Sequence, residues 1–279
     1  MKLSTLLIFV MIWVAGFGFA QESTIPVPQP RGVAEPKSAS ELIWADLMEG
    51  NQRFISGKLK SIGVVPLRQS LATKQNPKVV VLACSDSRVS PEILFDKNLG
   101  DLFVVRSAGN VADAIGVGSI EYAVEHLGSS VLLVLGHTGC GAVQAACSGD
   151  KMPSPNLQAD IDKIVPAVSR AKRYARSEEL EKAAIRENVH QSTNDVIAGS
   201  EVLQHFLHDG KLTVFEAVYD LSSGKVVQLK TIPGRDEQST GGQSAVAVSQ
   251  DLLHSGNINR RIAVSHRPTA ELLDHVGVK

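Results

Sequence analysis

Two short clusters hold the residues of this chain that could perform metal chemistry. Cys84, Asp86 and Arg88 alternate with serines in one run, and His137 and Cys140 follow later in the chain. Two thiols and one imidazole form a ligand set that suits zinc. Structural zinc sites are normally closed by four protein ligands, so a fourth position left for water would make this site catalytic. The sequence therefore predicts a zinc site whose function depends on what fills that position.

Each cluster directly follows a strongly apolar run, residues 79–83 before the first and 131–135 before the second. Apolar runs without polar alternation predict buried strands of a parallel sheet, and ligands collect at the carboxyl ends of such strands. If the two strands are neighbours, Cys84 and His137 converge on one point, and Cys140 can join them from the following turn. Helix N-termini and a dication would both favour thiolates there.

Asp86 and Arg88 have the spacing of a charge-assisted, bidentate pair. An ordinary ion pair that stabilises a loop is one interpretation. In the other, Arg88 orients Asp86, which accepts a hydrogen bond from a zinc-bound water or hydroxide. Zinc would supply the nucleophile by lowering the pKa of its water toward neutrality.

Nucleotides and nucleic acids are not expected as partners. The glycine-containing run 136–141 lacks both the G-x-G-x-x-G order and the Lys-Ser/Thr ending of phosphate-binding loops. The formal net charge is −1, and no basic stripe is present in the sequence.

The order of the elements predicts an α/β fold with a mostly parallel central sheet, an added antiparallel edge hairpin and flanking helices. Strands are expected over residues 79–83, 102–105, 131–136 and 212–219, the last with a hairpin partner over 225–229. Helices are expected over residues 117–127, 156–190 and 200–208, and directly after Gly139. Cys147 falls on the helix after Gly139 and is interpreted as a small buried apolar residue. A further helix is expected to begin at the capping-box pair Ser38 and Glu41 and to end at Gly50.

Four segments are predicted along the chain. Residues 1–20 have the charged start, apolar run and small-residue cleavage site of a secretory signal peptide, and residues 21–37 form a proline-rich linker. Residues 38–233 form the domain, and residues 234–279 are a C-terminal extension of unknown role. An uncleaved anchor is the alternative for the first segment, but its apolar run is short for a membrane span. The mature chain is therefore expected to be exported, to the periplasm, with no stable membrane anchor.

The joint pattern resembles the β-class carbonic anhydrases. It consists of C-x-D-x-R beginning at Cys84 and H-x-x-C beginning at His137. The runs 100–106 and 120–127 are also typical of that family, and the resemblance covers about residues 40–230. It implies a zinc lyase that interconverts carbon dioxide and bicarbonate, releasing a proton, by means of zinc-bound hydroxide.

The resemblance also implies roles for the residues of the two clusters. One zinc ion per subunit would be bound by Cys84, His137 and Cys140, with Asp86 and Arg88 as the catalytic pair. In some family members the aspartate leaves its arginine and becomes a fourth zinc ligand. Those closed-site members resemble one another in having an aromatic residue three positions before the first cysteine, where this chain has a valine. An open, water-bound site is therefore expected, which Asp86 could still close at low pH.

Three further positions take their roles from the resemblance alone. Gln75 matches the family's substrate-side glutamine, whose amide can hydrogen-bond an oxygen of carbon dioxide or bicarbonate. Phe103 and Tyr122 match aromatic residues that line the narrow pocket, often from the neighbouring subunit, although residue type alone would place them in a core. The resemblance therefore also implies a homodimer or a dimer of dimers.

Two other functions stay open. Hydrolysis of carbon disulfide or carbonyl sulfide occurs on the same fold, and a substrate panel would separate it from carbon dioxide hydration. A non-catalytic zinc-binding protein is the second alternative. The presence of Asp86, Arg88 and Gln75 argues against it, because a purely structural zinc site would not need all three.

Overall fold

The computed structural model describes residues 37–60 and 63–234. The signal peptide expected over 1–20, nearly all of the linker over 21–37 and nearly all of the extension over 234–279 lie outside the described residues. These three assignments stay predictions. Within the described ranges, no helix combines the length and apolar character needed to cross a membrane.

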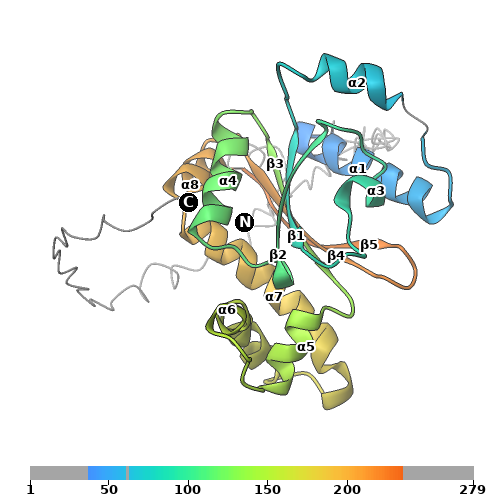
Figure 1. Cartoon of the computed structure of the whole chain (residues 1–279). Coiled ribbons are helices and arrows are strands. Elements are labelled where there is room, and N and C mark those ends of the chain that lie inside the picture. Colours follow the sequence, from blue (N-terminus) through green and yellow to red (C-terminus); the bar gives the residue numbers. More distant parts are fainter. Residues whose placement is uncertain (1–36, 61–62, 235–279) are drawn as a thin grey trace, which may run out of the picture.

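A central sheet of five strands has helices on both faces (Figure 1). The strands are β1 (Val79–Cys84), β2 (Leu102–Ser107), β3 (Val131–His137), β4 (Thr213–Tyr219) and β5 (Val226–Ile232). Their order across the sheet is β2-β1-β3-β4-β5. The first four strands run parallel, and β5 pairs with β4 in antiparallel direction. The predicted α/β sheet with an antiparallel edge hairpin is confirmed.

Alternate residues of the strands enter two different cores. Val79, Val81 and Ala83 pack on the face that carries helix α1 (Ala39–Ile55), while Val80 and Leu82 pack on the opposite face. Every residue of β1 and β3 is buried, which explains why these strands show no polar alternation. Strand β2 differs, because it lies at the edge of the sheet and its residues are half-buried or exposed.

The parallel register aligns the two strands that precede the sequence clusters. Val79 is opposite Val131 and Ala83 is opposite Leu135, so β1 and β3 end at the same edge of the sheet. Cys84 and His137 therefore lie at neighbouring strand ends, as expected from the apolar runs before them.

The remaining helices match the sequence expectations in part. They are α2 (Val64–Ser70), α3 (Pro91–Leu94), α4 (Ala114–Glu125), α5 (Gly141–Ser148), α6 (Pro155–Ala171), α7 (Leu180–Ala198) and α8 (Glu201–His208), with 3-10 turns η1 (Ala108–Asn110) and η2 (Ser177–Glu179). Helix α2 was not expected. Helix α4 begins earlier than predicted because Asp113 caps it, accepting hydrogen bonds from the backbone N–H groups of Ile115 and Gly116.

Residues 156–190, expected to be helical, form two helices with a turn between them rather than one. The chain turns after α6 and returns as α7, so that the two helices pack against each other in one core with residues such as Ile164 and Ile185. One uninterrupted helix could not fold back to bury both apolar faces.

Helix α1 has the predicted capping box but a different end. Ser38 accepts a hydrogen bond from the N–H of Glu41, and the Glu41 carboxylate accepts one from the N–H of Ser38. The helix continues through Gly50 to Ile55, so the predicted stop at Gly50 is wrong. Glycine is needed there for packing, because a Cβ atom would lie 1.8 Å from the carbonyl oxygen of Phe95.

We expect the substitution Gly50→Ala to destabilise the fold by about 3 kcal/mol, since the added methyl group meets backbone that cannot move aside cheaply. Urea unfolding at fixed protein concentration measures this change. Gly118→Ala is the matched control, because it also adds a methyl group inside a helix but meets nothing within 4 Å. A Gly50→Ala variant as stable as the Gly118→Ala variant would contradict the packing argument.

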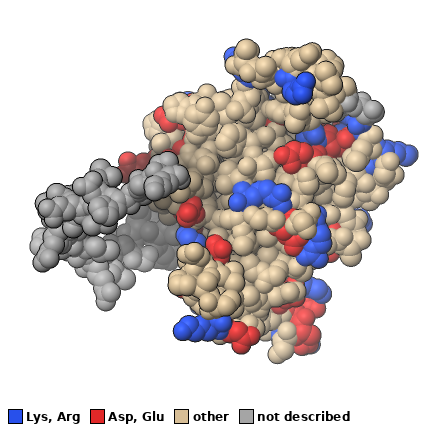
Figure 2. Space-filling model, in the orientation of Figure 1, with Lys and Arg blue, Asp and Glu red and all other residues tan. Residues whose placement is uncertain are grey.

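Charged side chains of both signs are interspersed on the face of the molecule shown in Figure 2. This distribution agrees with a formal net charge of −1 for the whole chain.

Candidate metal centre

Cys84, His137 and Cys140 come together at the carboxyl edge of the sheet. Their ligand atoms all lie within 4.8 Å of one another, and all three residues are buried. The two sulfur atoms are 4.0 Å apart. Cys84 ends β1, His137 ends β3 and Cys140 is the N-cap of α5, so three different local structures converge on one small volume.

The ring of His137 is prepared to bind a metal. Its Nδ1 lies 2.9 Å from the carbonyl oxygen of Thr138, and as Nδ1–H it donates to that oxygen. This hydrogen bond selects the tautomer whose Nε2 lone pair is free. Nε2 is buried and has no hydrogen-bond partner among the described residues. A buried polar atom without a partner is rare, and a metal ion bound together with the two thiols would satisfy it.

Backbone and buried amide groups fix the position of Cys84. The N–H of Gly109 donates to its sulfur over 3.3 Å, and the side chain of Asn188 on α7 donates to the carbonyl oxygen of Gly109 over 2.7 Å. Gly109 has a φ of 68°, and a Cβ atom there would lie 2.5 Å from Cδ1 of Ile164. Only glycine fits this turn without displacing its neighbour.

The two thiols share a proton. The hydrogen bond with Cys140 is the main cause that lowers the pKa of Cys84 to about 4, with a further contribution from His137. The same contact, together with burial, raises the pKa of Cys140. One sulfur is therefore readily ionised while the other keeps the proton, an arrangement in which a metal cation can replace that proton.

Asp86 and Arg88 form the bidentate pair that their spacing indicates. Arg88 donates from Nε to Oδ1 over 2.9 Å and from Nη2 to Oδ2 over 2.7 Å, and its backbone N–H also donates to Oδ1. The side-chain hydrogen bonds of Arg88 hold the pKa of Asp86 well below its usual range. Asp86 Oδ2 is 3.9 Å from Nε2 of His137, so an ionised carboxylate lies beside the ligand set and is turned toward Arg88.

Sequence reasoning missed three residues that support this geometry. Arg106 on β2 donates to the carbonyl oxygens of Cys84 and Asp86 over 3.0 and 2.7 Å. Asn188 and Glu181 reach the centre from α7. An arginine near the end of a predicted strand was a weak sequence signal that Arg106 supports the site. Asn188 and Glu181 belong to a helix whose sequence gives no indication of the site.

The family model described as carbonic anhydrase matches residues 79–226, which include both clusters. This chain belongs to the carbonic anhydrase family.

Named relatives and a solved structure together place it in the β class. Carbonic anhydrase 2 of Mycobacterium tuberculosis is 36% identical over 198 residues, which cover 69% of this chain and 94% of that protein. The carbonic anhydrase of Mycolicibacterium smegmatis is 37% identical and covers 68% of this chain and 94% of its own length. The β-carbonic anhydrase of Coccomyxa, solved with acetazolamide, superposes with a TM-score of 0.55 at 27% identity, covering 72% of this chain and 88% of the other. The chain is thus an enzyme of the β-carbonic anhydrase type.

In this carbonic anhydrase chain, Gln75, Phe103 and Tyr122 lie away from the metal centre. Gln75 is exposed before β1 begins, whereas Cys84 ends that strand. The six residues of β1 separate its two ends by roughly 17 Å. Phe103 is opposite Val80 near the same early end, and its ring lies 6.4 Å from that of Tyr122, which is 49% exposed. Within a single chain these three residues do not lie beside the cluster of Cys84, His137 and Cys140.

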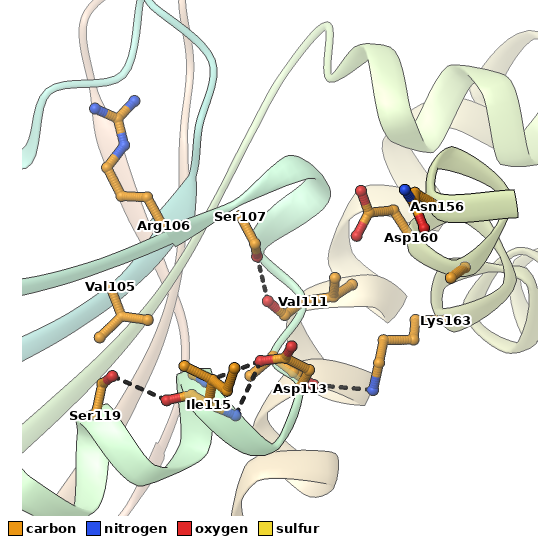
Figure 3. Close-up of a pocket in the computed structure, with 13 residues that line it drawn as sticks. Val105, Arg106, Ser107, Val111, Asp113, Ile115, Ser119, Asn156, Asp160 and Lys163 are labelled. Atoms are coloured by element: carbon orange, nitrogen blue, oxygen red, sulfur yellow. Dashed lines mark hydrogen bonds between the residues drawn. The ribbon is translucent and has the colours of Figure 1, made fainter. Parts of the chain in front are cut away.

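A pocket of about 580 Å³ lies beside the carboxyl end of β2 (Figure 3). Its lining includes Ser107, which is opposite Cys84 in the sheet, as well as Asp113 and Lys163. Lys163 donates to the carbonyl oxygen of Ala112, and none of the three cysteine and histidine ligands lines the pocket. The pocket therefore neighbours the metal centre without containing it.

The third cysteine is separate from the ligand set. Cys147, on α5, is half-buried rather than fully buried, and it packs against the core that contains Cys84 and Cys140. Burial raises the pKa of its thiol. This apolar surrounding agrees with the interpretation of Cys147 as a packing residue.

Proposed function

We propose that this protein catalyses the reversible hydration of carbon dioxide to bicarbonate and a proton, with one zinc ion per subunit held by Cys84, His137 and Cys140. One observation carries the proposal above all: the buried Nε2 of His137, which has no hydrogen-bond partner within residues 37–60 and 63–234, lies beside two thiols and an ionised carboxylate. The names of the carbonic anhydrase relatives support the same reaction.

When bound, zinc supplies the Lewis acidity that makes water a nucleophile near neutral pH. The protein's own contribution is orientation. An ionised Asp86 can only accept hydrogen bonds, so a water molecule that donates to it presents its oxygen lone pair to the carbon of carbon dioxide. Arg88 holds the carboxylate ionised and fixed in position through two side-chain hydrogen bonds.

The direction of the Asp86 side chain supports an open site. Both of its oxygens are engaged by Arg88, which leaves the fourth position to water. Release from Arg88 would let the nearby Oδ2 approach the ligand set and act as a conditional fourth ligand. The proposed closed state therefore requires that the bidentate pair break first.

The decisive experiment is a stopped-flow carbon dioxide hydration assay on the mature chain, with zinc content measured on the same sample. Carbon disulfide and carbonyl sulfide belong in the substrate panel. We expect hydration of carbon dioxide from protein that contains one zinc ion per chain. Zinc-loaded, folded protein that does not hydrate carbon dioxide would contradict the proposal. If such protein hydrolyses carbon disulfide or carbonyl sulfide instead, the alternative function is supported.

We further propose a homodimer or a dimer of dimers, in which Gln75, Phe103 and Tyr122 complete the pocket of a second copy. Their position at the early end of β1 supports this arrangement, because they cannot serve their own metal centre. Mixing a Cys84→Ser variant with a Gln75→Ala variant, followed by refolding together, should recover activity that neither has alone. Light scattering gives the number of chains.

Export of the mature chain is also proposed, from the signal-peptide pattern over residues 1–20. N-terminal sequencing of the protein recovered from the periplasmic fraction should begin near Gln21. Recovery of the full-length chain from the cytoplasm would contradict export.

A further inference from the structure

The turn between His137 and Cys140 is held from both sides. Gly139 lies in this turn with a φ of 65°. Its N–H donates to Oε1 of Glu181 over 3.1 Å, and its carbonyl oxygen accepts from Nη2 of Arg88 over 3.1 Å. The two hydrogen bonds engage the peptide planes before and after Gly139. Together they fix the backbone rotation of a residue that, as glycine, has little preference of its own.

Glu181 is placed to hold this turn. It lies in the first turn of α7, where the helix dipole favours an anionic side chain. Its other oxygen, Oε2, accepts from Nε2 of Gln144 on α5 over 3.2 Å. Within the described ranges Glu181 forms no ion pair with Lys or Arg, so both of its hydrogen bonds are made to the segment that follows His137.

The carbonyl of Gly139 links Glu181 to the catalytic pair. The Nη2 atom of Arg88 donates both to that carbonyl and to Oδ2 of Asp86. If Gly139 rotates, its carbonyl turns away and Arg88 loses one of the contacts that fix its guanidinium. The orientation of Asp86 depends on that guanidinium, because both carboxylate oxygens are bonded to it.

We propose that Glu181 is a positioning residue for the carbon dioxide hydration site: by holding the Gly139 turn, it keeps Arg88, and through it Asp86, in the orientation that leaves the fourth zinc position to water. This inference rests on the proposed function. It differs from a general stabilising role, because it requires the effect of Glu181 to pass through Arg88. Groups that orient the residues around a metal typically change activity by about tenfold to a hundredfold when removed.

The variants Glu181→Ala and Glu181→Gln test the inference. The amide oxygen of glutamine can still accept from Gly139, whereas alanine cannot. In stopped-flow assays of the zinc-loaded enzyme, Glu181→Ala should lower kcat/KM about tenfold with zinc content unchanged, and Glu181→Gln should stay within about twofold of the wild type. Glu179→Ala is the matched control, because within the described ranges the Glu179 side chain bonds to exposed Lys182 and not to the Gly139 turn. If Glu181→Ala does not fold, Glu181→Asp replaces it, since its shorter side chain withdraws from Gly139.

A double-mutant cycle separates positioning from a general effect on stability. In an Arg88→Ala background, adding Glu181→Ala should cost less than about twofold more, because the contact through which Glu181 acts is already gone. An equal loss in both backgrounds would overturn the inference. So would a Glu181→Ala enzyme as active as the wild type, a loss that only follows lost zinc, or a Glu181→Gln enzyme as impaired as Glu181→Ala.

Amide hydrogen exchange provides a measurement that does not depend on activity. The Gly139 N–H, followed by NMR, should exchange faster in Glu181→Ala and at the wild-type rate in Glu181→Gln, and the Arg88 Nε–H should change with it. Unchanged exchange at both groups would overturn the inference. A wild-type chain that does not hydrate carbon dioxide would instead contradict the proposed function, and the exchange rates would still decide whether Glu181 holds the turn.

Discussion

Replacing Cys84 with serine is expected to remove both zinc binding and carbon dioxide hydration. Serine is close in size, but its hydroxyl does not ionise near neutral pH and is a poor ligand for zinc. Cys84 and Cys140 are in hydrogen-bond contact, and a zinc ion would bind both as thiolates, so serine at position 84 removes one of two anionic ligands. Without zinc the water nucleophile is lost, and we expect kcat/KM to fall by at least about a thousandfold.

Cys147→Ser is the control for this experiment. It makes the same chemical change at a cysteine that lies outside the ligand set, and it should keep stoichiometric zinc and near wild-type activity. Zinc content by atomic absorption and stopped-flow hydration are the two measurements. A Cys84→Ser protein that retains zinc and activity would show that the metal lies elsewhere.

The second large effect is expected from Asp86→Asn. Asparagine keeps the shape of the side chain but can donate a hydrogen bond as well as accept one, so it no longer fixes the direction of the reacting water. It also weakens the bidentate contact with Arg88. Loss of a group that directs proton position typically costs a hundredfold or more, and we expect kcat/KM to fall by about 10²-fold with zinc retained.

The pH dependence of this loss follows from the pKa of Asp86. Arg88 holds that pKa well below its usual range. In an assay that spans roughly pH 6 to 9, the carboxyl group therefore stays ionised throughout. Protonation would occur only at a pH far more acidic than this window. The Asp86→Asn enzyme should therefore be slower by a similar factor at every pH in the window, with no shift of the profile.

Asp209→Asn serves as the matched control. Lys211 and His208 also lower the pKa of Asp209, but this residue lies at the end of α8, and its partners in the described part of the chain do not include Cys84, His137 or Cys140. It should leave kcat/KM unchanged. An Asp86→Asn loss confined to one end of the pH range would contradict the assignment of Asp86 as an ionised acceptor.

The residues of the candidate metal centre could be predicted from sequence because simple rules of sheet geometry apply to them. Two apolar runs indicated buried parallel strands, whose carboxyl ends meet at one edge of the sheet if the strands are neighbours, as β1 and β3 are. Cys84 and His137 follow from this rule without any knowledge of side-chain contacts. The spacing of Asp86 and Arg88 indicated their bidentate contact, which the structure contains, and the family resemblance then gave the pair its catalytic role.

The residues that support the ligands could not be predicted in this way. Asn188 and Glu181 reach the centre from a helix that begins far along the chain, and they act on backbone groups of Gly109 and Gly139. Every residue has a backbone N–H or carbonyl group, so the residue type of the backbone partner does not reveal which side chain bonds to it. Gly50 is a second example of a role that the sequence does not reveal. A glycine at that position suggested the end of a helix, whereas glycine is required there because a side chain would collide with the carbonyl oxygen of Phe95.

Strand β2 leaves one edge of the sheet open to pairing with a second chain. As an edge strand it offers a row of outward backbone groups with no strand partner among the described residues, and helix α4 beside it exposes Ile115 and Tyr122. An open edge with apolar neighbours favours pairing with another chain. If copies meet there, dilution removes part of what stabilises each chain, and its melting temperature becomes a function of protein concentration.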